Sequence, residues 1–149
     1  MSAIRIIGCG NILSYDEGVG VHVARKLNNK ILPENVEIKE LRASGQLNED
    51  FITGADKIII IDACVPESCR GINVNRTTPK NNDLKDMFSQ TMHAHNLYPL
   101  FSSVSGTLPE EIIIITVEIE VRDKFSIGLS KNVFSAVDNV IEKVMAELY

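Results

Sequence analysis

Three short, mainly apolar runs dominate the sequence and alternate with segments of helical periodicity. They cover residues 4–8, 57–61 and 112–119 and are rich in isoleucine. Runs of this length and composition are typical of strands that are buried on both faces of a sheet. Such a sheet needs a layer of helices on each side. The sequence therefore predicts an α/β fold, a three-layer sandwich in which a mostly parallel, twisted sheet of about five strands has helices on both faces.

The remaining elements follow from hydrophobic spacing and from capping residues. Val19, Val23 and Leu27 recur at helical spacing, and Ser130 is placed to cap the helix that ends the chain. We expect the most apolar strand, 112–119, at the centre of the sheet. The other expected elements are strands at 36–41 and, at a sheet edge, 71–76; helices at 19–28, 46–51, 95–102 and 131–149; and a long loop with one helical turn at 77–92.

Size and charge limit the classes of protein to which the chain can belong. The 149 residues include 44% hydrophobic and 23% charged residues, which predicts one domain, 1–149, with a substantial core. No stretch approaches the roughly 18 to 20 apolar residues that cross a bilayer, and the N-terminus lacks a signal-peptide pattern. We therefore expect a cytoplasmic protein without membrane association. A formal net charge of -5 without a Lys/Arg run argues against nucleic acid as a partner.

Three cysteines, Cys9, Cys64 and Cys69, give an odd count in a chain without an export signal. This predicts reduced, buried thiols rather than a disulfide framework. A zinc site formed by Cys64, Cys69, His93 and His95 is a rival interpretation. The C-x4-C and H-x-H spacings, however, fit no common structural-zinc pattern.

The first candidate site is the glycine-rich segment GCGNILSYDEGVG, residues 8–20. It follows the first strand, where glycine permits positive φ and close backbone approach. A nucleotide loop is disfavoured because the third glycine of the dinucleotide fingerprint and the Gly-Lys-Ser/Thr of a P-loop are both missing. Asp16 and Glu17 would also repel a phosphate there. These carboxylates either complement a helix dipole, by up to about 1 kcal/mol, or bind a cation at the carboxyl end of the strand.

The second candidate site combines Asp62 with one histidine. Asp62 follows four isoleucines, so its carboxylate lies at the rim of the sheet and must be hydrogen-bonded, paired or metal-bound; an Asx turn is an equally good explanation. His93 and His95 are two residues apart, which puts their side chains about 200° apart on a helix. We therefore expect only one of them to face the site. Oxygen and nitrogen ligands without a thiolate suit nickel or zinc.

Taken in order, these motifs resemble those of the endopeptidases that mature nickel-iron hydrogenases. The resemblance rests on GCGNILSYDEGVG, IIIIDA and HNL, and it extends over nearly the whole chain through ILPENVEI and FSIGLS. Two motifs of the family differ here. Its Ser-Pro-His stretch is replaced by His93-Ala94-His95, and its Gly-Gly-Thr-x-Gly turn by LRASG, in which only Gly45 matches.

The resemblance implies a metal site and a reaction. Glu17, Asp62 and His95 would hold nickel that the substrate carries, with His93 as the alternative to His95. The implied partner is a nickel-iron hydrogenase large-subunit precursor, which would lose its C-terminal extension after nickel insertion. The alternative is a non-catalytic, metal-dependent chaperone that docks on the same subunit.

The expected chemistry is a carboxylate-assisted attack of water, with Asp16 or Asp62 as the base. Neither Ser14 nor Ser44 has the surroundings of a nucleophile elbow. Nickel could in addition polarise the scissile carbonyl or activate the water.

Overall fold

The computed structural model describes residues 2–43, 45–104, 106–122 and 125–149. Within these ranges, five strands form one sheet in the order β2-β1-β3-β5-β4. Neighbouring strands run parallel except β4, which is antiparallel to β5 at the edge. The strands are β1 (Ile4–Gly10), β2 (Val36–Arg42), β3 (Lys57–Cys64), β4 (Ile72–Thr77) and β5 (Glu111–Glu118).

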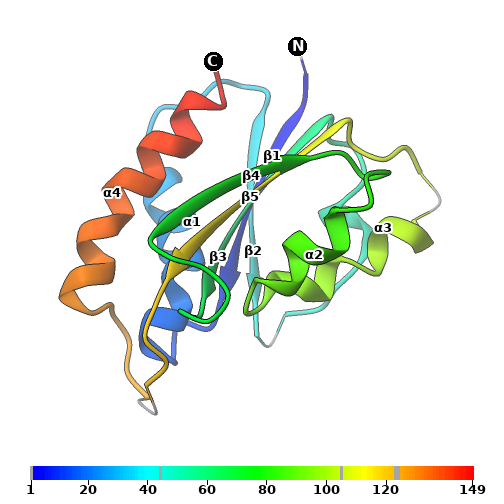
Figure 1. Cartoon of the computed structure of the whole chain (residues 1–149). Coiled ribbons are helices and arrows are strands. Elements are labelled where there is room, and N and C mark those ends of the chain that lie inside the picture. The colour runs from blue at the N-terminus through cyan, green and yellow to red at the C-terminus, as the bar shows by residue number, and fades with distance from the viewer. Residues whose placement is uncertain (1, 44, 105, 123–124) are drawn as a thin grey trace.

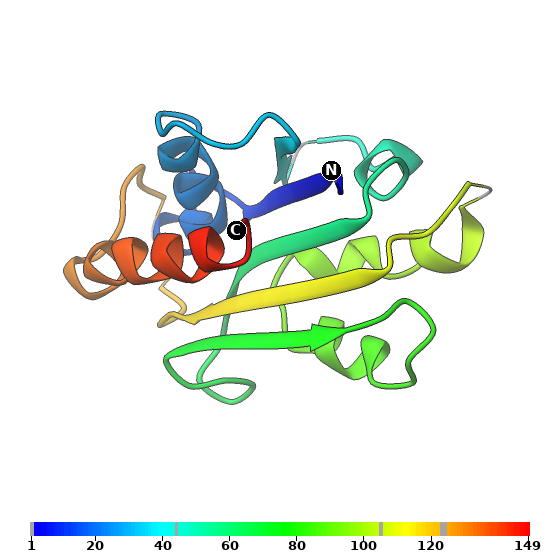
Figure 2. The same ribbon diagram turned by 90° about the horizontal axis from the view of Figure 1, so that it is seen from above.

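Helices cover both faces of the sheet, as Figures 1 and 2 show. One face packs against α1 (Val19–Leu27) and α4 (Lys131–Ala146). The other packs against α2 (Leu84–Ser89), α3 (Leu100–Ser103) and the short 3-10 helices η2 (Glu49–Phe51) and η3 (Ala94–Leu97). The predicted three-layer α/β fold is confirmed. No helix in the described ranges has both the length and the apolar character needed to cross a membrane.

Side-chain alternation along β3 decides which layer each residue joins. Ile59 and Ile61 enter the core beneath α1 and α4, whereas Ile58 and Ile60 enter the core beneath α2 and η3. Because alternate residues of a strand point to the same face, Asp62 continues the series of Ile58 and Ile60. Its carboxylate therefore faces the layer that contains α2 and η3.

Three expectations about the elements need correction. The run 112–119 forms β5, which lies between β3 and β4, so β3 and not β5 is the middle strand. The helix expected at 46–51 is reduced to the single turn η2. The helix expected at 95–102 is divided into η3 and α3 around Pro99, because proline has no N–H for a continuous helix.

Two glycines allow α1 to approach the sheet closely. A Cβ on Gly20 would collide with the carbonyl oxygens of Cys9 and Ile61, and one on Gly10 would collide with the carbonyl oxygen of Glu17. Gly10 also has a φ of 154°, which side-chain-bearing residues rarely adopt. These contacts place the start of α1, and Glu17 just before it, directly over the carboxyl ends of β1 and β3.

Both chain termini lie at the opposite, amino end of the sheet (Figure 1). Lys57 donates to the side chain of Glu147 at 3.0 Å and to its carbonyl oxygen at 2.9 Å. Arg76 pairs with Glu147 at 2.6 Å and also with Glu111. These four residues, termed the amino-end network, attach the end of α4 to three strands.

Candidate functional site

Asp62 is completely buried, and backbone and imidazole donors surround its carboxylate. Its Oδ1 accepts from the Ala63 N–H at 2.8 Å and lies 3.0 Å from Nδ1 of His93. Its Oδ2 accepts from the N–H groups of His93 at 2.5 Å and Ala94 at 2.7 Å. A buried carboxylate needs partners of this kind. Asp62 therefore fixes both the start of η3 and the orientation of the His93 ring.

The second nitrogen of His93 faces Glu17. Its Nε2 lies 3.4 Å from Oε1 of Glu17, and the two side chains remain 19% and 24% exposed. The N-cap of η3, the strand β3 and the turn before α1 thus contribute His93, Asp62 and Glu17 to one arrangement at the carboxyl end of the sheet. With Nδ1–H donated to Asp62, Nε2 is the nitrogen available to a ligand.

The electrostatic surroundings of His93 favour a positive charge. Burial by itself lowers the pKa of His93, but the hydrogen bond to Asp62 and the negative charges of Asp62 and Glu17 raise it. The raising effects prevail, so the pKa of His93 lies above its ordinary value of 6.5. The same two carboxylates would favour a bound cation at this place.

Asp16 and Glu17 are adjacent in η1 (Tyr15–Gly18) but point to different parts of the molecule. Asp16 is 3% exposed, and its Oδ1 accepts from the Ser130 N–H at 2.7 Å. Ser130 is the N-cap of α4, so the contact fixes the start of that helix. The structure brings Glu17, and not Asp16, to His93.

His95 is not brought to Glu17 and Asp62. It lines a separate surface pocket of about 410 Å³ together with Phe88 and Tyr98. His93 is the N-cap of η3, whereas His95 lies within it, so the backbone turns the second ring away from the carboxylates. The sequence allowed only one of the two histidines to face the site. The contact between His93 and Asp62 shows that His93 is that histidine.

No group of three or more His, Cys, Asp or Glu side chains among the described residues is arranged to hold a metal ion. Glu17 and His93 contribute two potential ligands, while the oxygens of Asp62 are already hydrogen-bonded. Of the two serines considered as nucleophiles, Ser14 forms a backbone bridge with Ser126. Ser44 lies outside the described residues.

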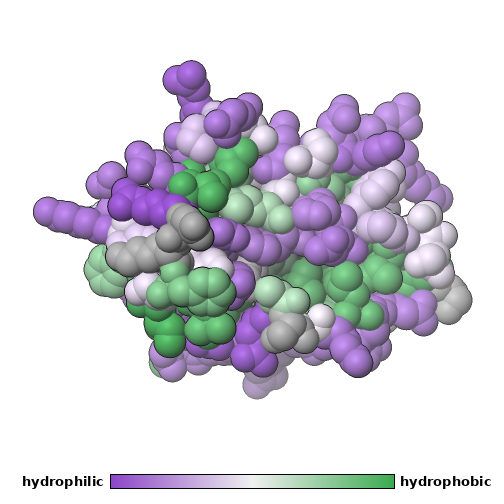
Figure 3. Space-filling model, turned by 90° about the horizontal axis from the view of Figure 1, so that it is seen from below, coloured by the Kyte–Doolittle hydropathy of each residue, from purple (hydrophilic) through white to green (hydrophobic). Residues whose placement is uncertain are grey.

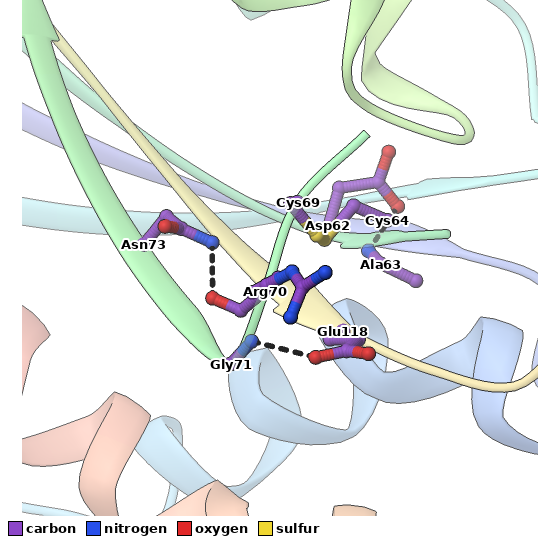
Figure 4. Close-up of a disulfide and its surroundings, with 8 residues drawn as sticks. All are labelled: Asp62, Ala63, Cys64, Cys69, Arg70, Gly71, Asn73 and Glu118. Atoms are coloured by element: carbon purple, nitrogen blue, oxygen red, sulfur yellow. Dashed lines mark hydrogen bonds between the residues drawn. A yellow bond between two sulfur atoms is a disulfide. The ribbon is translucent and has the colours of Figure 1, made fainter. Parts of the chain in front are cut away.

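A disulfide joins Cys64 to Cys69, which corrects the expectation of three reduced thiols. A tight turn after β3, in which Cys69 N–H donates to the Val65 carbonyl at 3.1 Å, brings the Cα atoms to 6.1 Å. The bond removes both sulfurs from the rival zinc site, and Figure 4 shows it beside Asp62. Cys9 is free and buried as expected; burial first, and the charge of Asp62 second, raise the pKa of its thiol.

The family model of hydrogenase maturation proteases matches residues 21–147. The chain belongs to the hydrogenase maturation protease family. It is 30% identical over 155 residues to a protein of Methanocaldococcus jannaschii that is provisionally named a hydrogenase maturation protease, covering 97% of this chain and 96% of that one. It is 27% identical over 150 residues to the hydrogenase 2 maturation protease of Escherichia coli, covering 97% and 90%.

Solved structures agree with the family assignment of this maturation protease. The hydrogenase maturating endopeptidase HybD of E. coli superimposes with a TM-score of 0.81 at 28% identity, over 98% of this chain and 91% of that one. A hydrogenase 2 maturation peptidase from a thaumarchaeote shares the fold, with a TM-score of 0.74 at 23% identity over 98% and 97%. The protein is a hydrolase of the endopeptidase class, and the predicted family, fold and enzyme class are confirmed.

Proposed function

We propose that this maturation protease removes the C-terminal extension of a nickel-iron hydrogenase large-subunit precursor, and that it recognises the inserted nickel through Glu17 and His93. One observation supports this recognition above all others. His93 is held by Asp62 at Nδ1 and presents Nε2 to the partly exposed carboxylate of Glu17. The name of the E. coli relative, hydrogenase 2 maturation protease, supports a hydrogenase subunit as the substrate.

The available ligands suit an ion that arrives already coordinated. One carboxylate oxygen and one imidazole nitrogen are acceptable to a borderline divalent metal such as nickel. Two protein ligands bind weakly alone, but they can complete the shell of an ion that the precursor already holds. Binding of this kind would distinguish nickel-loaded from empty precursor.

Asp62 has a supporting role in this proposal. Carboxylates that accept from the far nitrogen of a metal-binding histidine fix its tautomer and ring orientation. Asp62 has this relation to His93 and is fully buried. The proposed set therefore contains His93 in the place predicted for His95, with Asp62 as the residue that orients the ring.

The substrate's nickel would supply Lewis acidity near the scissile carbonyl. Glu17 and His93 would fix the position of that carbonyl relative to the protease. The predicted base, Asp16 or Asp62, gains no support from the geometry, because both are buried and bonded to backbone N–H groups.

The test is an intact-mass assay of a nickel-loaded large-subunit precursor incubated with purified protease. The wild-type protein should shorten the loaded precursor and leave the nickel-free precursor intact. Glu17→Gln and His93→Gln should each reduce the rate by at least about 10-fold, because each removes one proposed ligand. The matched control, His95→Gln, should cleave at close to the wild-type rate.

Two results would contradict the proposal. If wild-type protease leaves a precursor of verified nickel content at full mass, the proposed substrate is wrong. If His95→Gln abolishes cleavage while His93→Gln does not, the proposed recognition site is wrong even though the protease activity stands.

A further inference from the structure

Bulky apolar side chains are exposed next to the proposed nickel-recognition site. Leu13 is 49% exposed, Phe125 86% and Ile127 71%. Figure 3 looks onto the carboxyl end of the molecule and shows hydrophobic side chains gathered beside a largely hydrophilic centre. A contiguous exposed cluster of this kind is unusual in a folded protein unless it contacts a partner.

Backbone hydrogen bonds hold this cluster in place. Ser126 N–H donates to the Leu13 carbonyl and Tyr15 N–H donates to the Ser126 carbonyl, both at 3.0 Å, forming a parallel bridge between Ser14 and Ser126. Residues on either side of a bridge position point to the same face. The bridge thus sets Leu13 beside Phe125 and keeps Ile127 on the same side.

A groove of about 380 Å³ runs along this cluster. Its lining includes the apolar residues Ile12, Leu13 and Phe125, together with Arg42 at the end of β2. The Arg42 side chain is 56% exposed and lies 3.8 Å from its carboxylate neighbour Glu40. An apolar wall with a cation at one end suits a partner that carries both a bulky apolar side chain and a carboxylate.

The groove and the proposed nickel-recognition site share one loop. Asn11, which also lines the groove, donates its N–H to the Glu17 carbonyl at 3.3 Å, so one short loop forms both features. A precursor whose nickel lies at Glu17 and His93 must pass its own chain over the surface on either side. The groove offers such a chain apolar contact at Leu13 and Phe125.

We infer that the groove docks an extended segment of the precursor next to its nickel, a segment with a bulky apolar side chain and a nearby carboxylate. This inference rests on the proposed function and adds a second, metal-independent contact to it. Phe125 contributes apolar area and Arg42 the complementary charge. The precursor is thereby selected by its chain as well as by its metal.

The experiment compares Phe125→Ser, Leu13→Ser and Arg42→Gln, three changes in the groove lining, with Phe134→Ser. Phe134 is a phenylalanine on α4 that is 68% exposed and serves as the matched control. The equilibrium binding of nickel-loaded precursor and the kcat and KM of its cleavage are measured for each variant. The three groove variants should bind about tenfold more weakly and raise KM with kcat unchanged. Phe134→Ser should match the wild type.

Sedimentation of the protease alone completes the test. If the wild type forms dimers that Phe125→Ser abolishes, while precursor binding is unchanged, the patch contacts a second copy of this chain and the inference is wrong. Cleavage with unaltered KM in all three groove variants also overturns it and leaves the proposed function intact. Groove-dependent binding without any cleavage would overturn the proposed function instead, and absence of precursor binding by the wild type would overturn both.

Discussion

The two ends of the sheet both gather carboxylates, but they balance the charge differently. At the amino end, Glu111 and Glu147 pair with Arg76, and Glu147 also pairs with Lys57. At the carboxyl end, Glu17 and Asp62 meet an imidazole and backbone N–H groups. In the ranges that the structure describes, neither Glu17 nor Asp62 forms an ion pair with a lysine or arginine.

This difference indicates that the charges at the amino end stabilise the fold, whereas those at the carboxyl end are available for chemistry. The amino-end network neutralises its carboxylates with permanently charged partners and attaches α4 to the sheet. The carboxyl end leaves negative charge opposite an imidazole, which releases its proton to solvent when it binds a metal ion. Substitutions at the two ends should therefore change the free energy of unfolding by different amounts and with different dependence on pH.

The largest effect is expected for Asp62→Asn. The amide cannot accept all four hydrogen bonds, and its NH₂ group would face a donor, so we expect a loss of about 2 to 3 kcal/mol in the free energy of unfolding. Misorientation of His93 should lower precursor cleavage as well. The control is Asp56→Asn at the amino end, an exposed aspartate whose carboxylate accepts from the Ala3 N–H. Urea denaturation that gives equal losses for both variants would remove the distinction between the two ends.

The second-largest effect on stability is expected from loss of the disulfide at the carboxyl end. It closes the short loop between Cys64 and Cys69, and chain entropy predicts a stabilisation of about 2 kcal/mol. Reduction with a dithiol should lower the free energy of unfolding of the wild type by that amount. Cys69→Ala should be less stable than the oxidised wild type and insensitive to the reductant. A reductant effect that persists in Cys69→Ala would show that the bond is not its cause.

A smaller effect, with a defined sign, is expected for His93→Gln. Because the pKa of His93 is raised in the folded protein, its contribution to stability is fully present below about pH 6.5, the ordinary value. It is lost as the pH rises through the higher folded pKa. Unfolding measurements from pH 5 to 9 should show the wild type losing its advantage over His93→Gln on the alkaline side.

Glu17→Gln is the control for this titration. It removes one of the charges that raise the pKa of His93, so the imidazole should titrate at lower pH in this variant than in the wild type. NMR of the ring protons measures the change directly. An unchanged titration would mean that Glu17 does not influence His93 in solution.

The smallest effect is expected at the amino end, for Glu147→Gln. The hydrogen bond from Arg76 lowers the pKa of Glu147; burial opposes this, and Lys57 adds to it. A lowered pKa gives stability above about pH 4.5 that is lost as the pH falls through the folded value, the opposite sign to His93. We expect a loss of about 0.5 to 1 kcal/mol at pH 7 with unchanged cleavage. As the control, Glu142→Gln at an exposed position of α4 should change neither the stability nor the cleavage rate.

The sequence by itself determined the layers and the family. The isoleucine-rich runs are too apolar to be exposed on either face, and the glycine-rich segment at 8–20 fits only a close strand-to-helix turn. These are local constraints, so spacing and composition reveal them. Asp62 and Glu17 could be placed at strand ends for the same reason, although their roles as ligands stay predictions.

Tertiary structure alone decided which groups meet. His93 and His95 lie two residues apart in one short segment, and the carboxylate of Asp62, far away in sequence, fixes His93 toward Glu17. Cys64 and Cys69 are only five residues apart and meet through the local turn after β3, a pairing that an odd cysteine count does not indicate. Contacts between residues far apart in sequence depend on how whole elements pack, and the hydrophobic pattern of a single segment carries no record of that packing.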